Sequence, residues 1–181
     1  MQSLRRWSLI GCLTMEWLAL SLWVGGLIVL VGGVIPAVFN TFGGQEIGGV
    51  FLTKTFENYQ RFLMGSAVVL CGGLAYRRWS GEQIVAVKWS EVVLVGVMVV
   101  SVGILVLVLH PQAVSLQEQA FAASGEEAKR AAFEALFRIL MPIRILYTVT
   151  VVGGVALMVV KAKASLTMAG RLDEKSVARF G

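Results

Sequence analysis

The sequence predicts an all-α integral membrane protein, an antiparallel bundle of four transmembrane helices with glycine-rich helix contacts. Of its 181 residues, 57% are hydrophobic, and its mean hydropathy of +0.78 exceeds that of ordinary soluble domains. Apolar runs near the roughly 20 residues needed to cross a bilayer recur along the chain. Lysines and arginines cluster at the ends of these runs. The net charge of +5 therefore indicates membrane topology and not nucleic-acid binding.

We expect one transmembrane domain over residues 1–181. Its four spans are predicted at about 16–39, 60–77, 89–110 and 136–161, followed by a short cytoplasmic tail over 162–181.

The first and second spans need separate justification. Residues 16–39 are too long for a typical signal-peptide core and end in Pro-Ala-Val-Phe instead of a small-residue cleavage site, so we expect a retained helix. The second span is short. It follows a stretch in which Phe51, Phe56 and Tyr59 recur near helical spacing, which predicts an amphipathic segment lying in the membrane interface.

The third and fourth spans flank an Ala- and Glu-rich stretch over 111–135. Ser124 precedes Glu127 by three residues, as in a capping box, so a helix is expected to begin here and run into the last span. This stretch and residues 40–60 are the two predicted outward loops.

The basic residues predict the orientation, because loops that stay in the cytoplasm carry more lysine and arginine. One side holds Arg5, Arg6, Arg77, Arg78, Lys88, Lys161, Lys163, Arg171, Lys175 and Arg179. The other side holds Lys54, Arg61, Lys129, Arg130 and Arg138. We expect both termini in the cytoplasm and the protein in a bacterial cytoplasmic (inner) membrane.

Glycines recur seven residues apart in three of the predicted spans. The pairs are Gly25 and Gly32, Gly26 and Gly33, Gly65 and Gly72, and Gly96 and Gly103. Seven residues make two turns at 3.5 residues per turn, and small residues let membrane helices approach closely. This spacing predicts a left-handed bundle whose glycine stripes face one another. The alternative is that glycine is simply common in membrane helices.

The first span and the residues after it resemble a known family. The matching positions are Trp23, Gly25, Gly26, Pro36, Ala37, Phe39, Gly48 and Phe51. In these the chain is similar to the transmembrane-protein-205-like family, a domain of unknown function numbered 4149, whose members are small four-helix bacterial membrane proteins. The last span keeps Phe137 and Leu140 of the family pattern but has Met141 and Arg144 where histidine and serine are common. The resemblance implies the fold and no chemistry.

Ionisable residues in or near the predicted spans are candidate site residues because charge is costly there, and the four candidates are Glu16, Glu91, His110 and Arg144. Glu16 and Glu91 lie near the cytoplasmic ends of the first and third spans. They either face each other or a cation, or they act as hydrated anchors beside tryptophans. Arg144 follows Pro142 by two residues, so it is expected to satisfy the carbonyl that proline frees or to extend outward.

A metal site is the sharpest chemical alternative. His110, Met64 and Met141 are predicted near the outer boundary, and imidazole and thioether ligands suit Cu(I). Methionine is also a common gap filler in apolar helices. With one histidine in the chain, bis-histidine haem ligation is excluded, and no nucleophile has a base at a recognisable spacing. We expect no cofactor and no enzymatic activity.

Two functions remain open. One is a non-catalytic accessory subunit that binds lipid, other membrane proteins or a second copy of itself, with Phe51, Phe56 and Tyr59 as contact residues. The other is a small transporter or copper-handling protein with a site near the outer face. The spans are nearly free of polar side chains at mid-membrane, where Ser21 and Ser101 stand alone in the first and third. That favours the accessory subunit.

Overall fold

A computed structural model describes residues 2–42, 45–80 and 87–180, and the regular structure of these residues is helical. The elements in order are α1 (Gln2–Val29), the π-helical turn η1 (Leu30–Val34), α2 (Ile35–Phe42), α3 (Gln45–Ser80), α4 (Trp89–Ile104), the π-helical turn η3 (Leu105–Leu109), α5 (His110–Ala122) and α6 (Glu126–Phe180).

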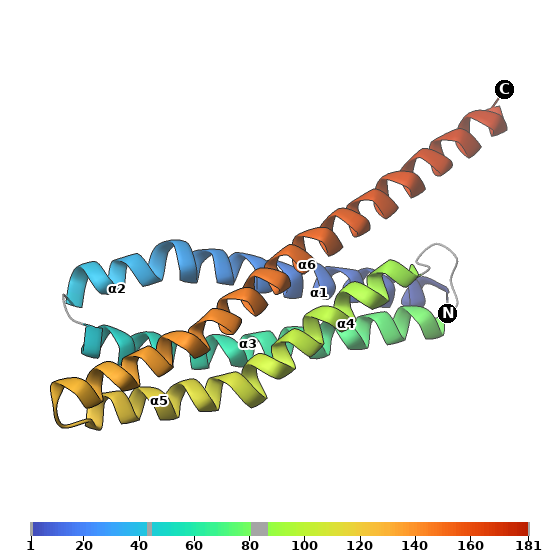
Figure 1. Ribbon diagram of the computed structural model, residues 1–181. Helices are drawn as coiled ribbons and strands as arrows, with labels where there is room; N and C mark the ends of the chain where they lie inside the picture. The colour runs from blue at the N-terminus through green and yellow to red at the C-terminus, as the bar shows by residue number, and fades with distance from the viewer. Residues whose placement is uncertain (1, 43–44, 81–86, 181) are drawn as a thin grey trace.

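These elements form four rods, because α1, η1 and α2 run on as one rod and α4, η3 and α5 as another (Figure 1). Successive rods run in opposite directions. We call the end of the bundle where α1 and α4 begin the terminal end, and the end where α2 meets α3 and α5 meets α6 the turn end. Beyond the terminal end, α6 continues alone (Figure 1).

Three helical stretches among the described residues are long and apolar enough to cross a membrane: Trp7–Phe42, Trp89–Ala122 and Glu127–Leu166. This is consistent with an integral membrane protein. The remaining rod, α3, is more polar, yet its 36 residues span about 54 Å at 1.5 Å per residue. It runs the length of the bundle beside α1 (Figure 1).

The helices extend beyond the predicted spans. The expected outer loop at 111–135 is a helical hairpin that turns at Gly125, whose φ of +111° suits glycine. The predicted interfacial segment is the first part of α3, so it does not form a separate element. The tail over 162–181 is helical as far as Phe180. Hydropathy marks where a membrane can lie, but a helix continues through any polar residues that favour it.

Two of the three prolines explain the π-helical turns. Pro36 and Pro111 each lie two residues after the end of one, η1 and η3. A proline ring clashes with the carbonyl four residues earlier, and a wider turn relieves the clash without breaking the rod. Pro142 lies inside α6. Both widened turns line the cavity described below.

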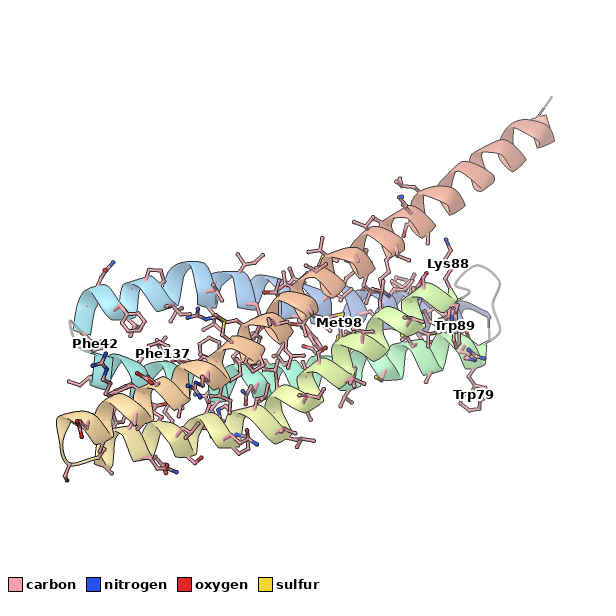
Figure 2. The ribbon with its side chains drawn as sticks, viewed as in Figure 1. Phe42, Trp79, Lys88, Trp89, Met98 and Phe137 are labelled. Atoms are coloured by element: carbon pink, nitrogen blue, oxygen red, sulfur yellow. The ribbon has the colours of Figure 1, made fainter. Side chains whose placement is uncertain are left out.

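The core forms where α1, α3, α4 and α6 meet. Its fully buried members include Trp23, Leu63, Met98 and Leu157, one from each of these helices. Met98 lies midway along the bundle (Figure 2). Two glycines on α6 permit the closest approach there: a Cβ on Gly154 would lie 2.5 Å from Val24, and one on Gly153 would lie 3.1 Å from Met98.

The predicted glycine stripes do not form the contacts within this chain. A Cβ added at seven of the eight positions would meet no atom within 4 Å; these are Gly25, Gly32, Gly33, Gly65, Gly72, Gly96 and Gly103. Gly26 is the exception, because a Cβ there would lie 2.5 Å from the Tyr59 ring. Seven-residue spacing puts two glycines on one face, but the rotation of the helix decides what that face touches.

Candidate functional site

Four charged side chains from four helices meet inside the terminal half of the bundle. They are Glu16 on α1, Arg77 on α3, Glu91 on α4 and Lys161 on α6, each at most 6% exposed. Arg77 Nη2 donates a hydrogen bond of 2.6 Å to Glu91 Oε2. Arg77 Nε lies 3.0 Å from Glu16 Oε1, an ion pair without hydrogen-bond geometry. Lys161 Nζ pairs with the other oxygen of Glu16.

This charge cluster holds equal numbers of positive and negative side chains and is closed to solvent. Two carboxylates face two cations, and helix ends add support: Arg77 is in the last turn of α3 and Glu91 in the first turn of α4. Each charge therefore complements the dipole of its helix. Gly73 makes room for the cluster, because a Cβ there would collide with the Glu16 carboxylate. The Cys12 thiol lies 3.8 Å from Glu16 Oε1.

The charge cluster lies close to the level of two exposed tryptophans. Trp79 is 90% exposed and Trp89 is 74% exposed, and both lie at the terminal end (Figure 2). Arg77 and Glu91 are each two residues further into the bundle, about 3 Å along the helix axis. Tryptophans gather at the membrane–water interface. The charges are therefore sealed among helices near the expected interface.

Sequence reasoning identified half of this cluster. It left Glu16 and Glu91 facing each other, facing a cation or acting as hydrated anchors, and the structure brings both onto Arg77, away from solvent. Arg77 and Lys161 were assigned to the cytoplasmic flanks. A signal for Arg77 was present: a basic residue closing one helix and an acidic residue opening the next are well placed to pair.

The turn half of the bundle contains an apolar cavity of about 1000 Å³. Side chains from all four rods line it, and they are mostly aliphatic or aromatic. Four large apolar lining residues are also exposed at the surface, so the cavity opens there; they are Ile28, Val31, Phe39 and Phe137. Its size and lining are those of a site for an apolar small molecule or chain.

Few polar groups line the cavity. The Thr53 hydroxyl lies 2.5 Å from Gln117 Oε1, which joins α3 to α5 and satisfies both groups. His110 Nε2 is buried and has no hydrogen-bond partner among the described residues. Arg144 also lines the cavity but is exposed, which places it at the opening. No described lining residue is acidic.

The predicted copper ligands do not share this cavity. Met64 is 44% exposed and Met141 63% exposed, and neither lines it, whereas His110 does. Among the described residues, no group of three or more His, Cys, Asp or Glu side chains is placed to hold a metal ion.

The predicted contact aromatics separate into two kinds. Phe51 is 48% exposed and stacks against Phe42 with ring centroids 5.9 Å apart. Phe56 turns inward, lines the cavity and lies 5.7 Å from the Tyr147 ring. The Tyr59 hydroxyl donates a 2.6 Å hydrogen bond to the Trp23 carbonyl of α1. Of these three side chains, Phe51 is exposed at the surface and Phe56 lines the cavity.

Comparison with known proteins identifies a family. The model of a domain of unknown function, DUF4149, matches residues 18–122, which is more than half of the chain. The chain belongs to the DUF4149 family. No curated protein and no solved structure matches it. The DUF4149 segment includes the C-terminal part of α1, from Leu18, and all of α2, α3, α4 and α5, so it carries Arg77, Glu91 and His110. Lys161 and Arg144, on α6, lie beyond it.

Proposed function

We propose that this DUF4149 protein is a non-catalytic integral membrane protein that binds a membrane partner in its apolar cavity. The partner is a lipid or an apolar segment of another membrane protein, as suits an accessory subunit. One observation carries the proposal: about 1000 Å³ of mostly apolar space that opens between exposed apolar side chains. In a bilayer, such an opening would face acyl chains and not water.

A fourth span is part of this proposal. The ends of α2 and the start of α4 lie at opposite ends of the bundle, and α3 joins them (Figure 1). If the rods formed by α1 and α4 both cross the membrane, α3 must return across it. The burial of Arg77 supports this, because its side chain is 5% exposed and paired with two carboxylates. A sealed pair removes much of the cost of a charge in a span.

We place both termini in the cytoplasm, with the terminal end of the bundle toward that side. Arg77 and Lys161 are buried in ion pairs, so they no longer count as free basic flanks. The bias survives without them, because Arg5, Arg6, Arg78, Lys88 and Lys163 remain on that side, with the basic residues of the C-terminal tail. A bacterial inner membrane fits this pattern.

The charge cluster supports binding without transport. Ionisable residues inside a bundle mark ion pathways in many transporters. Here each buried carboxylate is already held by a cation, and the cluster lies in the opposite half of the bundle from the cavity. A closed, balanced cluster fixes helices relative to one another and offers no charge to a substrate.

The transporter or copper-handling alternative is tested by metal analysis. We expect the purified protein to contain no stoichiometric copper, because His110 has no thioether neighbour in the cavity. Copper at one ion per chain that disappears in the His110→Ala variant would replace the present proposal with a metal site.

The proposal itself is tested by filling the cavity. Ala113 lines it, and Ala122 lies on the same helix, exposed and away from it. We expect Ala113→Phe to lower the number of lipid molecules retained per chain in native mass spectrometry, while Ala122→Phe leaves the number unchanged. Equal retention by wild type and both variants, with all three folded, would contradict binding in this cavity.

A further inference from the structure

Among the described residues that line the apolar cavity, the charged side chain is that of Arg144. The described residues that line it include one arginine and one histidine but no aspartate or glutamate. A ligand that filled the cavity would therefore meet positive charge and hydrogen-bond donors at its polar end. The presence of positive and absence of negative charge among these lining residues favours some membrane molecules over others as the ligand.

Arg144 and His110 both have side-chain nitrogens that can bind a ligand. Arg144 forms no ion pair with any described residue, and its guanidinium presents several donors in a fixed fork that suits phosphate oxygens. His110 Nε2 is buried without a partner, and an unpaired buried polar atom is costly. In the tautomer that carries the proton on Nε2, this nitrogen would donate a hydrogen bond to a ligand oxygen.

The neighbouring acidic residue Glu57 does not cancel the positive charge that lines the cavity. Glu57 on α3 interacts electrostatically with His110, but it does not line the cavity. Its carboxylate forms ion pairs outside the cavity, with Lys54 Nζ at 3.0 Å and with Arg61 Nη2 at 3.5 Å. The hydrogen bond from Lys54 lowers the pKa of the Glu57 carboxyl, so this group stays ionised and paired.

The residues at the opening of the cavity indicate where the ligand comes from. Ile28, Val31 and Phe137 at its edge are each more than half exposed, and they would contact acyl chains in a bilayer. A molecule that enters between them comes from the membrane. We propose that the occupant is an anionic phospholipid, with an acyl chain in the cavity and its phosphate at Arg144 and His110. This inference rests on the proposed function and names the ligand class of the same site.

The test compares two lipids with identical acyl chains on the full-length protein. Phosphatidylglycerol carries a net negative charge, and phosphatidylcholine carries none. We expect native mass spectrometry to show roughly tenfold tighter retention of phosphatidylglycerol, because the choline cation of phosphatidylcholine offsets the attraction of its phosphate to Arg144. Arg144→Gln should remove the preference while phosphatidylcholine retention changes little. Arg144→Lys should keep part of it, because lysine also binds phosphate as a point charge.

Arg138→Gln is the matched control, since Arg138 is an exposed arginine on the same helix that does not line the cavity. Equal retention of the two lipids by wild type, or an equal loss of preference in Arg138→Gln, would overturn the anionic-lipid inference and leave cavity binding standing. Failure of both lipids to bind folded wild-type protein would also overturn the inference, and it would leave an apolar protein segment as the partner in the proposed function. Thermal unfolding of every variant identifies any that fails to fold.

Discussion

Arg77 Nη2 lies 2.6 Å from Glu91 Oε2 across the α3–α4 contact, and both side chains are almost completely buried. The same guanidinium reaches Glu16, which in turn holds Lys161. One ionic cluster therefore links all four rods at the terminal end. Because its charges balance, the loss of one member should cost more than the loss of a matched pair.

Replacing Arg77 tests this cluster. We expect Arg77→Met to destabilise the fold by about 3–5 kcal/mol, because two buried carboxylates would then share one lysine. Arg78→Met is the control, since Arg78 is exposed. The double variant Arg77→Met with Glu91→Gln leaves Glu16 and Lys161 balanced and should recover part of the loss. Thermal unfolding in detergent measures all three, and a double variant less stable than Arg77→Met would refute charge balance as the cause.

Two glycines separate the observed helix contacts from the predicted ones. Gly154→Ala should destabilise the protein by about 1–3 kcal/mol through overpacking, because its Cβ would lie 2.5 Å from a methyl of the stiff, β-branched Val24. Gly103→Ala should be neutral or slightly stabilising, since its Cβ meets no atom within 4 Å and alanine favours helix. The measurement is the folded fraction after heating, by gel filtration. Equal sensitivity at both sites would restore the stripe model.

The hydrogen bond between Tyr59 and Trp23 predicts a structural role for an aromatic residue that the sequence assigned to a partner. Tyr59→Phe removes a 2.6 Å hydrogen bond from α3 to α1 and should cost about 0.5–1.5 kcal/mol in stability. Phe51→Ser alters an exposed ring and should leave thermal unfolding nearly unchanged. The role of Tyr59 is disproved if the two variants unfold at the wild-type temperature.

Chemical labelling can test the orientation of the protein in the membrane. With Cys12 and Cys71 replaced by serine, a single cysteine at Ser124 lies in the turn between α5 and α6. We expect a membrane-impermeant thiol reagent to label it from outside intact cells, because the turn end is proposed to face outward. Gly125 is avoided, since its positive φ would strain a cysteine. Labelling only after the cells are opened would reverse the proposed topology.

Local hydrophobicity alone predicted much of the architecture. Long apolar runs around residues 16–39, 89–110 and 136–161 predicted three helices, and each is part of a helical stretch long and apolar enough to cross a membrane. The resemblance to the domain of unknown function 4149 was confirmed over residues 18–122. These features follow from the sequence because transfer of side chains to a lipid-like environment depends on composition along a short window, independent of tertiary contacts.

Tertiary structure alone decided which faces meet. Helices that are apolar on nearly all sides carry little pattern to fix their rotation, so seven-residue spacing did not reveal that Gly26 packs within the chain and Gly32 does not. It also decided that Arg77 turns inward to Glu16 and Glu91. The cavity arises only where all four rods pass each other. Such contacts depend on the mutual packing of distant segments, which no short window of sequence contains.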